Sequence, residues 1–341
     1  MKLNFWALAA VGSVIVSAAM IGCNNTPVEP TAETTGGDAK PAAGRITIDG
    51  SSTVFVVTNQ VAEGFMDKNP DIKVNVSFSG TGNGFKKFAA GETDISNASR
   101  PIEKSEMEAL TTAKIEFVEV PVAYDGLTVV VNKDNTFVDK LTVAELKKMW
   151  EPEAQGKIMN WSDVRAGWPA TPIKLYGPGT GSGTFDYFTK VIVGKEKSSR
   201  TDYTPSEDDN QLVVGVTGDK GALGYFGYAY YLENQDKLKA VPIDPGTGAV
   251  APTAETIENR TYSPLSRPEF IYIKKSALDM PHVKTFVDFY LSPEGQELIK
   301  KSGYIPFKPE IYLKIAERVK AGTVGSLFSD QMGKPVEEMF P

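Results

Sequence analysis

The 341-residue sequence contains one cysteine and one histidine, and this scarcity excludes several kinds of site. With Cys23 alone, no disulfide can form within the chain, and no zinc site can be built from cysteine and histidine. A serine–histidine–aspartate triad would have to use His282, which follows Pro281 where a helix is expected to begin. We therefore interpret His282 as a solvent-exposed residue at a helix start, and we predict no metal site.

A surplus of positive charge is also missing. The chain has 36 lysines and arginines against 43 aspartates and glutamates, a formal net charge of −7. Nucleic-acid-binding proteins normally present a basic face, so we predict no nucleic-acid partner. A small anion can still bind, because a local field of backbone N–H dipoles can outweigh a distant net charge.

The first 22 residues have the pattern of a secretory signal peptide. Lys2 precedes an apolar stretch from Phe5 to Ile21, and the small residue Gly22 stands directly before Cys23. This resembles a bacterial lipoprotein signal, in which that cysteine is lipidated and becomes the first residue of the mature protein. A transmembrane anchor is the alternative, but the stretch is short for one and polar sequence follows it. Residues 23–44, with one aliphatic residue larger than alanine (Val28), are predicted to form a flexible tether.

Beyond residue 44 the sequence alternates between strand and helix patterns. Strands are predicted at 46–48, 72–78, 117–132 and 173–176, from alternating or continuous apolar residues. Helix starts are predicted from capping boxes at 105–108 and 142–145, and from Ser292 before Pro293. This order predicts an α/β fold with largely parallel sheets flanked by helices.

Three turns rich in glycine, serine and threonine each join a predicted strand to a predicted helix. They are Asp49–Thr53, Ser79–Gly84 and Gly177–Thr184. A helix N-terminus carries unsatisfied N–H groups, glycine allows a close approach, and hydroxyls add donors, so such turns suit an anion. A single turn of this kind is usually an ordinary helix cap. Three of them, with four glycines between Gly177 and Gly183, favour an anion site.

The kind of anion is narrowed by motifs that these turns lack. No lysine followed by serine or threonine ends either later turn, so a Walker loop is absent. The dinucleotide fingerprint and the G-x-S-x-G nucleophile elbow are absent as well. A small free oxyanion remains, and Arg100, between Ser99 and Pro101, could bind it bidentately or could form an ordinary salt bridge. We predict no cofactor and no enzymatic activity.

In this order, these elements resemble the phosphate-binding proteins of bacterial ABC importers, the PstS/SphX family. The stretches that carry the resemblance are DGSSTVF (49–55), SGTGNGFKKF (79–88), DISNASRPI (94–102), AYDGLTVVVN (123–132), YGPGTGSGTFDYF (176–188), GALGYFGYAYY (221–231), PLSRPEFIY (264–272) and GYIPF (303–307). The resemblance implies a two-lobed periplasmic-binding-protein fold of type II, with two crossing hinge strands. The lobes would be residues 45–122 with 265–341, and residues 123–264.

The resemblance also implies a phosphate site between the lobes. Its residues, carried over by motif, are Ser52 and Thr53, Thr81 with Gly82 or Ser79, Arg100, and Ser182, Gly183 and Thr184. One branch of the family has an aspartate at position 100, which accepts a proton from phosphate and repels sulfate. That branch also has an arginine where Pro178 stands. Selectivity for phosphate over sulfate or arsenate therefore stays open.

The expected function is that of a substrate-binding lipoprotein of an ABC importer. It would be a monomer, anchored to the membrane of the cell envelope through Cys23, that binds inorganic phosphate and delivers it to the permease. The alternatives are a receptor for another tetrahedral oxyanion, a phosphate sensor, or an envelope phosphatase. The phosphatase has the least support, because the chain lacks a metal cluster, a nucleophile elbow and a second histidine.

Overall fold

The computed structural model describes residues 44–329, 331 and 334–340. The predicted signal peptide, Cys23 and all of the tether but its last residue lie outside this range and stay predictions. Contacts group the described residues into one compact unit. Among the described helices, none has both the length and the apolar character needed to cross a bilayer.

One mixed sheet organises the protein, with strand order β2-β1-β3-β11-β4-β8-β6-β7 and β9 added to β4. β1 pairs in parallel with β2 and β3, and β6 pairs in parallel with β7 and β8. The central strands β11 and β4 are antiparallel to their neighbours. The strands are β1 Gly44–Gly50, β2 Ile72–Val76, β3 Ile95–Ala98, β4 Phe117–Asn132, β5 Leu141–Thr142, β6 Lys174–Pro178, β7 Thr204–Ser206, β8 Ala222–Gly227, β9 Leu238–Ala240, β10 Ile243–Asp244 and β11 Ser266–Lys274.

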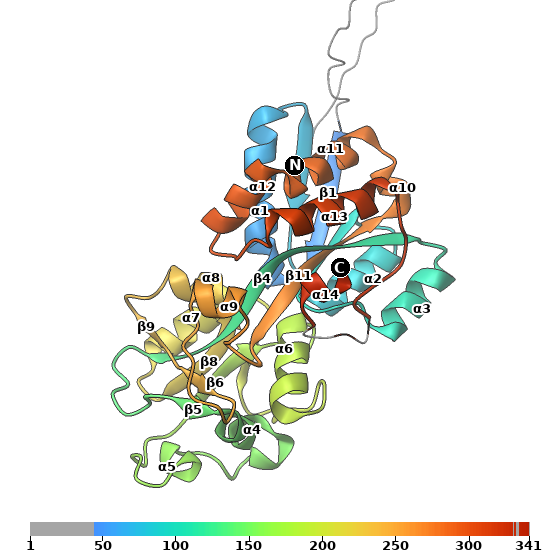
Figure 1. Cartoon of the computed structure of the whole chain (residues 1–341). Helices are drawn as coiled ribbons and strands as arrows, with labels where there is room; N and C mark the ends of the chain where they lie inside the picture. The colour runs from blue at the N-terminus through green and yellow to red at the C-terminus, as the bar shows by residue number, and fades with distance from the viewer. Residues whose placement is uncertain (1–43, 330, 332–333, 341) are drawn as a thin grey trace, which may run out of the picture. The chain divides into compact units, whose positions relative to one another are not determined.

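The longest strand, β4, takes part in both ends of this sheet, and β11 lies beside it (Figure 1). All sixteen residues of β4 are buried. Its first part pairs with β11, and residues 127–131 pair with β8. The register with β11 shifts between Glu269 and Phe270, opposite Pro121. Proline has no N–H to give to a ladder, so a bulge at this position lets it sit in a central strand.

Helices cover the sheet, and several begin as the sequence predicts. Thr142 and Glu145 form the predicted capping box, and Ser292 caps the helix that starts with Pro293. His282 lies in the first turn of its helix as predicted, but it is half-buried rather than exposed. The helices are α1 Ser52–Lys68, α2 Thr81–Ala89, α3 Lys104–Thr112, α4 Val143–Trp150, α5 Trp161–Val164, α6 Gly183–Phe188, α7 Asp209–Gly218, α8 Tyr228–Leu232, α9 Ala254–Glu258, α10 Lys275–Leu278, α11 Pro281–Leu291, α12 Pro293–Lys301, α13 Pro309–Lys320 and α14 Val336–Met339, with a 3₁₀ turn at Pro152–Ala154 and a π-helical turn at Thr189–Val193.

One predicted helix start is wrong. The sequence predicts a capping box at 105–108, but α3 begins earlier, with Glu103 as its N-cap and Glu106 as the reciprocal partner. The Glu103 N–H donates to Glu106 Oε2 at 2.8 Å. A glutamate can replace the usual serine here because its carboxylate is fixed from outside the helix by Arg100 and Lys197.

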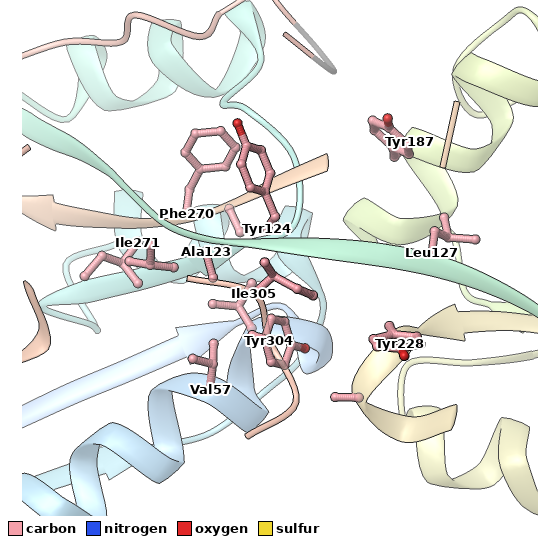
Figure 2. Close-up of a cluster of buried hydrophobic side chains, with 14 of the residues drawn as sticks. Val57, Ala123, Tyr124, Leu127, Tyr187, Tyr228, Phe270, Ile271, Tyr304 and Ile305 are labelled. Carbon is pink, nitrogen blue, oxygen red and sulfur yellow. The ribbon is translucent and has the colours of Figure 1, made fainter. Parts of the chain in front are cut away.

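The hydrophobic core is continuous along β4. Figure 2 shows Ala123, Tyr124 and Leu127 of this strand among side chains from other elements. These come from α1, β11, α6, α8 and the segment after α12, and all belong to one buried cluster. The core therefore reaches both parts of the sheet through the one strand that they share.

Candidate anion-binding site

The three glycine- and hydroxyl-rich turns lie where the sequence places them, between a strand and a helix. The first joins β1 to α1, the second joins β2 to α2, and the third joins β6 to α6. Ser51 caps α1, accepting from the Val54 N–H at 3.3 Å, and Ser182 caps α6, accepting from the Thr184 N–H at 3.1 Å. In α2 the N-cap is Gly80, with φ of +91°, a backbone conformation that favours glycine.

Contacts between these turns bring their hydroxyls together. Thr53 Oγ1 of the first turn lies 3.0 Å from Thr184 Oγ1 of the third. The Gly82 N–H of the second turn donates to the Gly181 carbonyl of the third at 3.0 Å. We call the four buried hydroxyl residues at this meeting point the hydroxyl cluster. They are Thr53, Thr81, Ser99 and Thr184.

Gly183 allows this close approach. A Cβ at this position would lie 2.5 Å from Thr81 Oγ1 and 2.7 Å from Ser99 Oγ, nearer than real Cβ atoms come to a neighbour. Thr81 Oγ1 and Ser99 Oγ are 3.2 Å apart, and the Ser99 N–H donates to the same threonine oxygen. The third turn can therefore approach the second only because residue 183 has no side chain.

The other two predicted serines lie beside the cluster with partners of their own. Ser52 is buried, and its hydroxyl donates to Asp209 Oδ2 over 3.4 Å. Ser182 holds the N-terminus of α6. The structure thus brings the predicted residues of all three turns into one region, although the first and third turns are more than a hundred residues apart. They are Ser52, Thr53, Thr81, Gly82, Ser182, Gly183 and Thr184, and all but the half-buried Gly82 are buried.

Arg100 lies next to this region, but its guanidinium is turned toward carboxylates. Its Nε donates to Asp186 Oδ2 at 2.7 Å, and its two terminal nitrogens donate to Glu106 at 2.8 Å each. Nη2 also lies 2.8 Å from Glu103, and Nη1 donates to the Pro101 carbonyl. Every N–H of the side chain has an acceptor from the protein, so its prediction as a direct anion ligand stays a prediction.

These acids belong to a larger group that we call the ionic cluster: Arg100, Glu103, Glu106, Asp186, Glu196 and Lys197. Lys197 Nζ donates to Glu103 Oε1 at 2.8 Å. Burial, a hydrogen bond to Glu103 and the nearby carboxylates raise the pKa of Glu196 to about 7. Burial raises the pKa of Asp186 despite the opposing effect of Arg100. Five of the six members line one side of a cavity of about 310 Å³ that reaches Gly82 and Gly181.

The ionic cluster is also where a metal ion would find carboxylates. Oxygens of Glu103, Asp186 and Glu196 lie within 4.8 Å of one another. Arg100 and Lys197 already pair with two of these three side chains. The protein itself therefore supplies the positive charge that a metal would bring.

A second buried arginine, Arg267, was not singled out as a site residue from the sequence. Its Nη2 donates to Thr184 Oγ1 at 2.8 Å, and its Nη1 donates to the Ser99 carbonyl at 2.9 Å. Asp125 and Glu269 pair with it at 3.2 and 2.8 Å. Its sequence signal is a pair of opposite charges, Arg267 and Glu269, inside strand β11, all nine residues of which are buried.

Asp209 is a further buried acid that the sequence did not single out. It is the first residue of α7, is 1% exposed, and accepts from Ser52. Burial raises its pKa to about 7, partly offset by Arg267. No spacing in the sequence links it to the turns, because the contact with Ser52 spans 157 residues.

A family model and two relatives of known name match most of this chain. The family model of the PBP superfamily domain matches residues 29–294. Protein SphX of Synechococcus elongatus is 45% identical over 297 residues, 86% of this chain and 87% of the relative. The phosphate-binding protein PstS of Staphylococcus epidermidis is 40% identical over 278 residues, 81% and 83% of the two chains.

A solved structure of a phosphate-binding protein is also similar to this chain. It is the substrate-binding protein assigned to a phosphate ABC transporter of Clostridium perfringens, with bound phosphate. It is 32% identical, has a TM-score of 0.65, and matches 77% of this chain and 100% of its own. The mixed sheet and its helices thus confirm the predicted type II periplasmic-binding-protein fold. The extent and identity of these matches place the chain in the PstS/SphX family of phosphate-binding proteins.

Proposed function

We propose that this protein captures inorganic phosphate at the hydroxyl cluster and delivers it, chemically unchanged, to the permease of an ABC importer. The observation that carries the proposal is the convergence of three turns on one buried, neutral group of hydroxyls beside helix N-termini. Such groups donate to an oxyanion without bringing competing negative charge. The relatives named phosphate-binding protein support phosphate as the ligand.

The donors would come from all three turns. We propose Ser52 and Thr53 from the first, Thr81 and Gly82 from the second, and Ser182, Gly183 and Thr184 from the third. A bound phosphate would take over the hydroxyls that now pair with one another across 3.0 to 3.2 Å. Arg100 would join them only by giving up one of its carboxylate partners.

The predicted division into lobes fits this arrangement. With residues 45–122 and 265–341 as one lobe and 123–264 as the other, the first two turns face the third across the site. β4 and β11 would be the hinge strands, since they alone among the described strands run between the two sets of parallel strands. Binding would then favour closure, because one ligand bridges both lobes.

Export and anchoring complete the proposal. A signal peptide at 1–22 and lipidation of Cys23 would hold a monomeric receptor at the outer side of a membrane, with residues 23–44 as the tether. Labelling cells with a radioactive fatty acid tests the anchor. Label should enter the wild-type protein and be absent from Cys23→Ser.

Calorimetric titration of the purified, anion-stripped protein tests the binding function. We expect phosphate to bind with one-to-one stoichiometry and an aryl phosphate ester to remain unhydrolysed. If sulfate binds as tightly as phosphate, the proposed ligand would be tetrahedral oxyanions in general rather than phosphate. Absence of binding by phosphate, arsenate and sulfate would overturn the proposal, and release of phosphate from the ester would favour a phosphatase.

A further inference from the structure

The ionic cluster joins two stretches of chain that are far apart in sequence. Arg100, Glu103 and Glu106 follow β3 and open α3, whereas Asp186 lies in α6 and Lys197 follows it. Two ion pairs connect the stretches: Arg100 Nε to Asp186 Oδ2 at 2.7 Å, and Lys197 Nζ to Glu103 Oε1 at 2.8 Å. Arg100 and Asp186 are each 1% exposed, so their pair is shielded from solvent screening.

Each side of the ionic cluster continues directly into a binding turn. Ser99, next to Arg100, donates its N–H to Thr81 of the second turn at 3.2 Å. Thr184 of the third turn lies two residues before Asp186 in α6. The ion pairs therefore hold the second and third turns together next to the contact between the Gly82 N–H and the Gly181 carbonyl.

The cluster also has more negative than positive charge. The carboxylates of Glu103, Glu106, Asp186 and Glu196 face one guanidinium and one ammonium. Oxygens of Glu103, Asp186 and Glu196 lie within 4.8 Å of one another. Carboxylates this close repel one another when ionised, so the arrangement favours a proton on one of them.

We infer that Arg100 is a positioning residue and that the ionic cluster is a proton-dependent latch that holds the second and third turns closed around the ligand. The inference rests on the proposed function and deepens it. The guanidinium acts through Asp186, because all its N–H groups already have protein acceptors. Opening the site would separate Arg100 from Asp186 and Lys197 from Glu103.

The direction of the pH dependence follows from Glu196. In the closed form Glu103, Asp186, Arg100 and Lys197 surround it, and its pKa is raised to about 7. Opening would expose it and return its pKa toward 4.5. A group whose pKa is higher in the closed form favours closing at low pH, and this contribution is lost as the pH rises through about 7.

The test compares the full-length mature protein with Lys197→Met, Glu196→Gln and the matched control Lys195→Met. Lys195 is an exposed neighbour outside the ionic cluster. Phosphate affinity is measured at pH 6 and pH 8. At pH 6 we expect Lys197→Met to bind about 5-fold more weakly than wild type, and Lys195→Met to be unchanged. For each protein we take the ratio of its phosphate affinity at pH 6 to its affinity at pH 8. This ratio should be about 3-fold larger for wild type than for Glu196→Gln, which has no carboxylate to titrate at position 196. The titration of phosphate itself affects both proteins equally and cancels in the comparison.

Hydrogen exchange without ligand keeps the latch separate from the binding function. Amides at 80–84 and 180–186 should exchange faster in Lys197→Met than in Lys195→Met. If wild type binds phosphate but Lys197→Met matches it in affinity and exchange, the latch is wrong and the function stands. If wild type binds no phosphate, the function is wrong, and the exchange comparison alone supports or overturns the latch. Identical pH ratios for wild type and Glu196→Gln would overturn its proton dependence.

Discussion

The hydroxyl cluster and the ionic cluster are neighbours, since Ser99 precedes Arg100 and Thr184 lies two residues before Asp186, yet they handle charge in opposite ways. The members of the hydroxyl cluster are neutral and pair with one another, and Thr184 also accepts from Arg267. In the ionic cluster both cations are paired with carboxylates of the protein. If the proposed function is correct, the anion meets neutral donors at the hydroxyl cluster, whereas the charged groups of the ionic cluster are already satisfied by one another.

The two clusters also differ in what a change of partner costs. A hydroxyl that leaves another hydroxyl for an oxyanion exchanges one hydrogen bond for a stronger, charge-assisted one. A buried guanidinium that leaves its carboxylate exposes an uncompensated charge. Exchange is therefore easy in the first cluster and costly in the second, and the following variants probe this difference.

Arg100→Met should have the largest effect, on stability rather than on binding alone. It leaves Asp186, Glu103 and Glu106 without the guanidinium, and breaking a buried pair from one side costs about 3–5 kcal/mol. Denaturant unfolding without phosphate measures this loss. Arg165→Met is the control, because Arg165 is 28% exposed and its pair with Glu145 should contribute about 1 kcal/mol or less. If Arg100→Met and Arg165→Met lose the same free energy of unfolding, changing a partner in the ionic cluster is not as costly as we expect.

Gly183→Ala should weaken phosphate binding about 100-fold, equivalent to about 2.7 kcal/mol. The added Cβ would collide with Thr81 Oγ1 and Ser99 Oγ, so the third turn could not approach the second. Gly218→Ala is the matched control, since a Cβ there meets nothing within 4 Å. Titration calorimetry of both variants decides the matter, and normal affinity in Gly183→Ala would show that this approach is not needed for binding.

Thr184→Val should have the smallest effect, a loss of affinity of about 10-fold with little change in shape. It removes a hydroxyl that contacts Thr53 at 3.0 Å and Arg267 at 2.8 Å. Thr217→Val removes an exposed hydroxyl, and its affinity should match that of wild type. If both valine variants bind equally well, Thr184 is not a ligand and the hydroxyl cluster would have a structural role only.

Local patterns predicted much of the fold. The strand at 117–132 was predictable because all its residues are buried, and a strand buried on both faces has a long, mainly apolar sequence. The capping box at 142–145 is correct, since both partners lie within four residues. The capping box predicted at 105–108 is wrong, because Glu103 and not Ser105 is the N-cap, and glutamate is not among the usual N-cap residues. The choice of Glu103 depends on Arg100 and on Lys197, which is 94 residues away.

The candidate site was predictable only as far as its motifs extend. The three turns could be identified from their glycine and hydroxyl content, and the structure shows contacts between them. The partners of Arg100 could not be predicted from the sequence, because Asp186 is 86 residues away and the sequence contains many other carboxylates. Arg267 reaches Ser99 across 168 residues. Its strand does not stand out in the sequence, because the other fully buried long strand, β4, also contains charged residues, Glu119 and Asp125.

The position of β11 has a consequence for how the chain folds during synthesis. β11 lies between β3 and β4, so the sheet is continuous only after residues 266–274 have been made. Until then β3, which ends at Ala98, has one edge without its final partner. Pairings so distant in sequence form slowly, and an unpaired edge invites contact with other chains. During synthesis the chain therefore passes through a long interval in which this edge of β3 is open to aggregation.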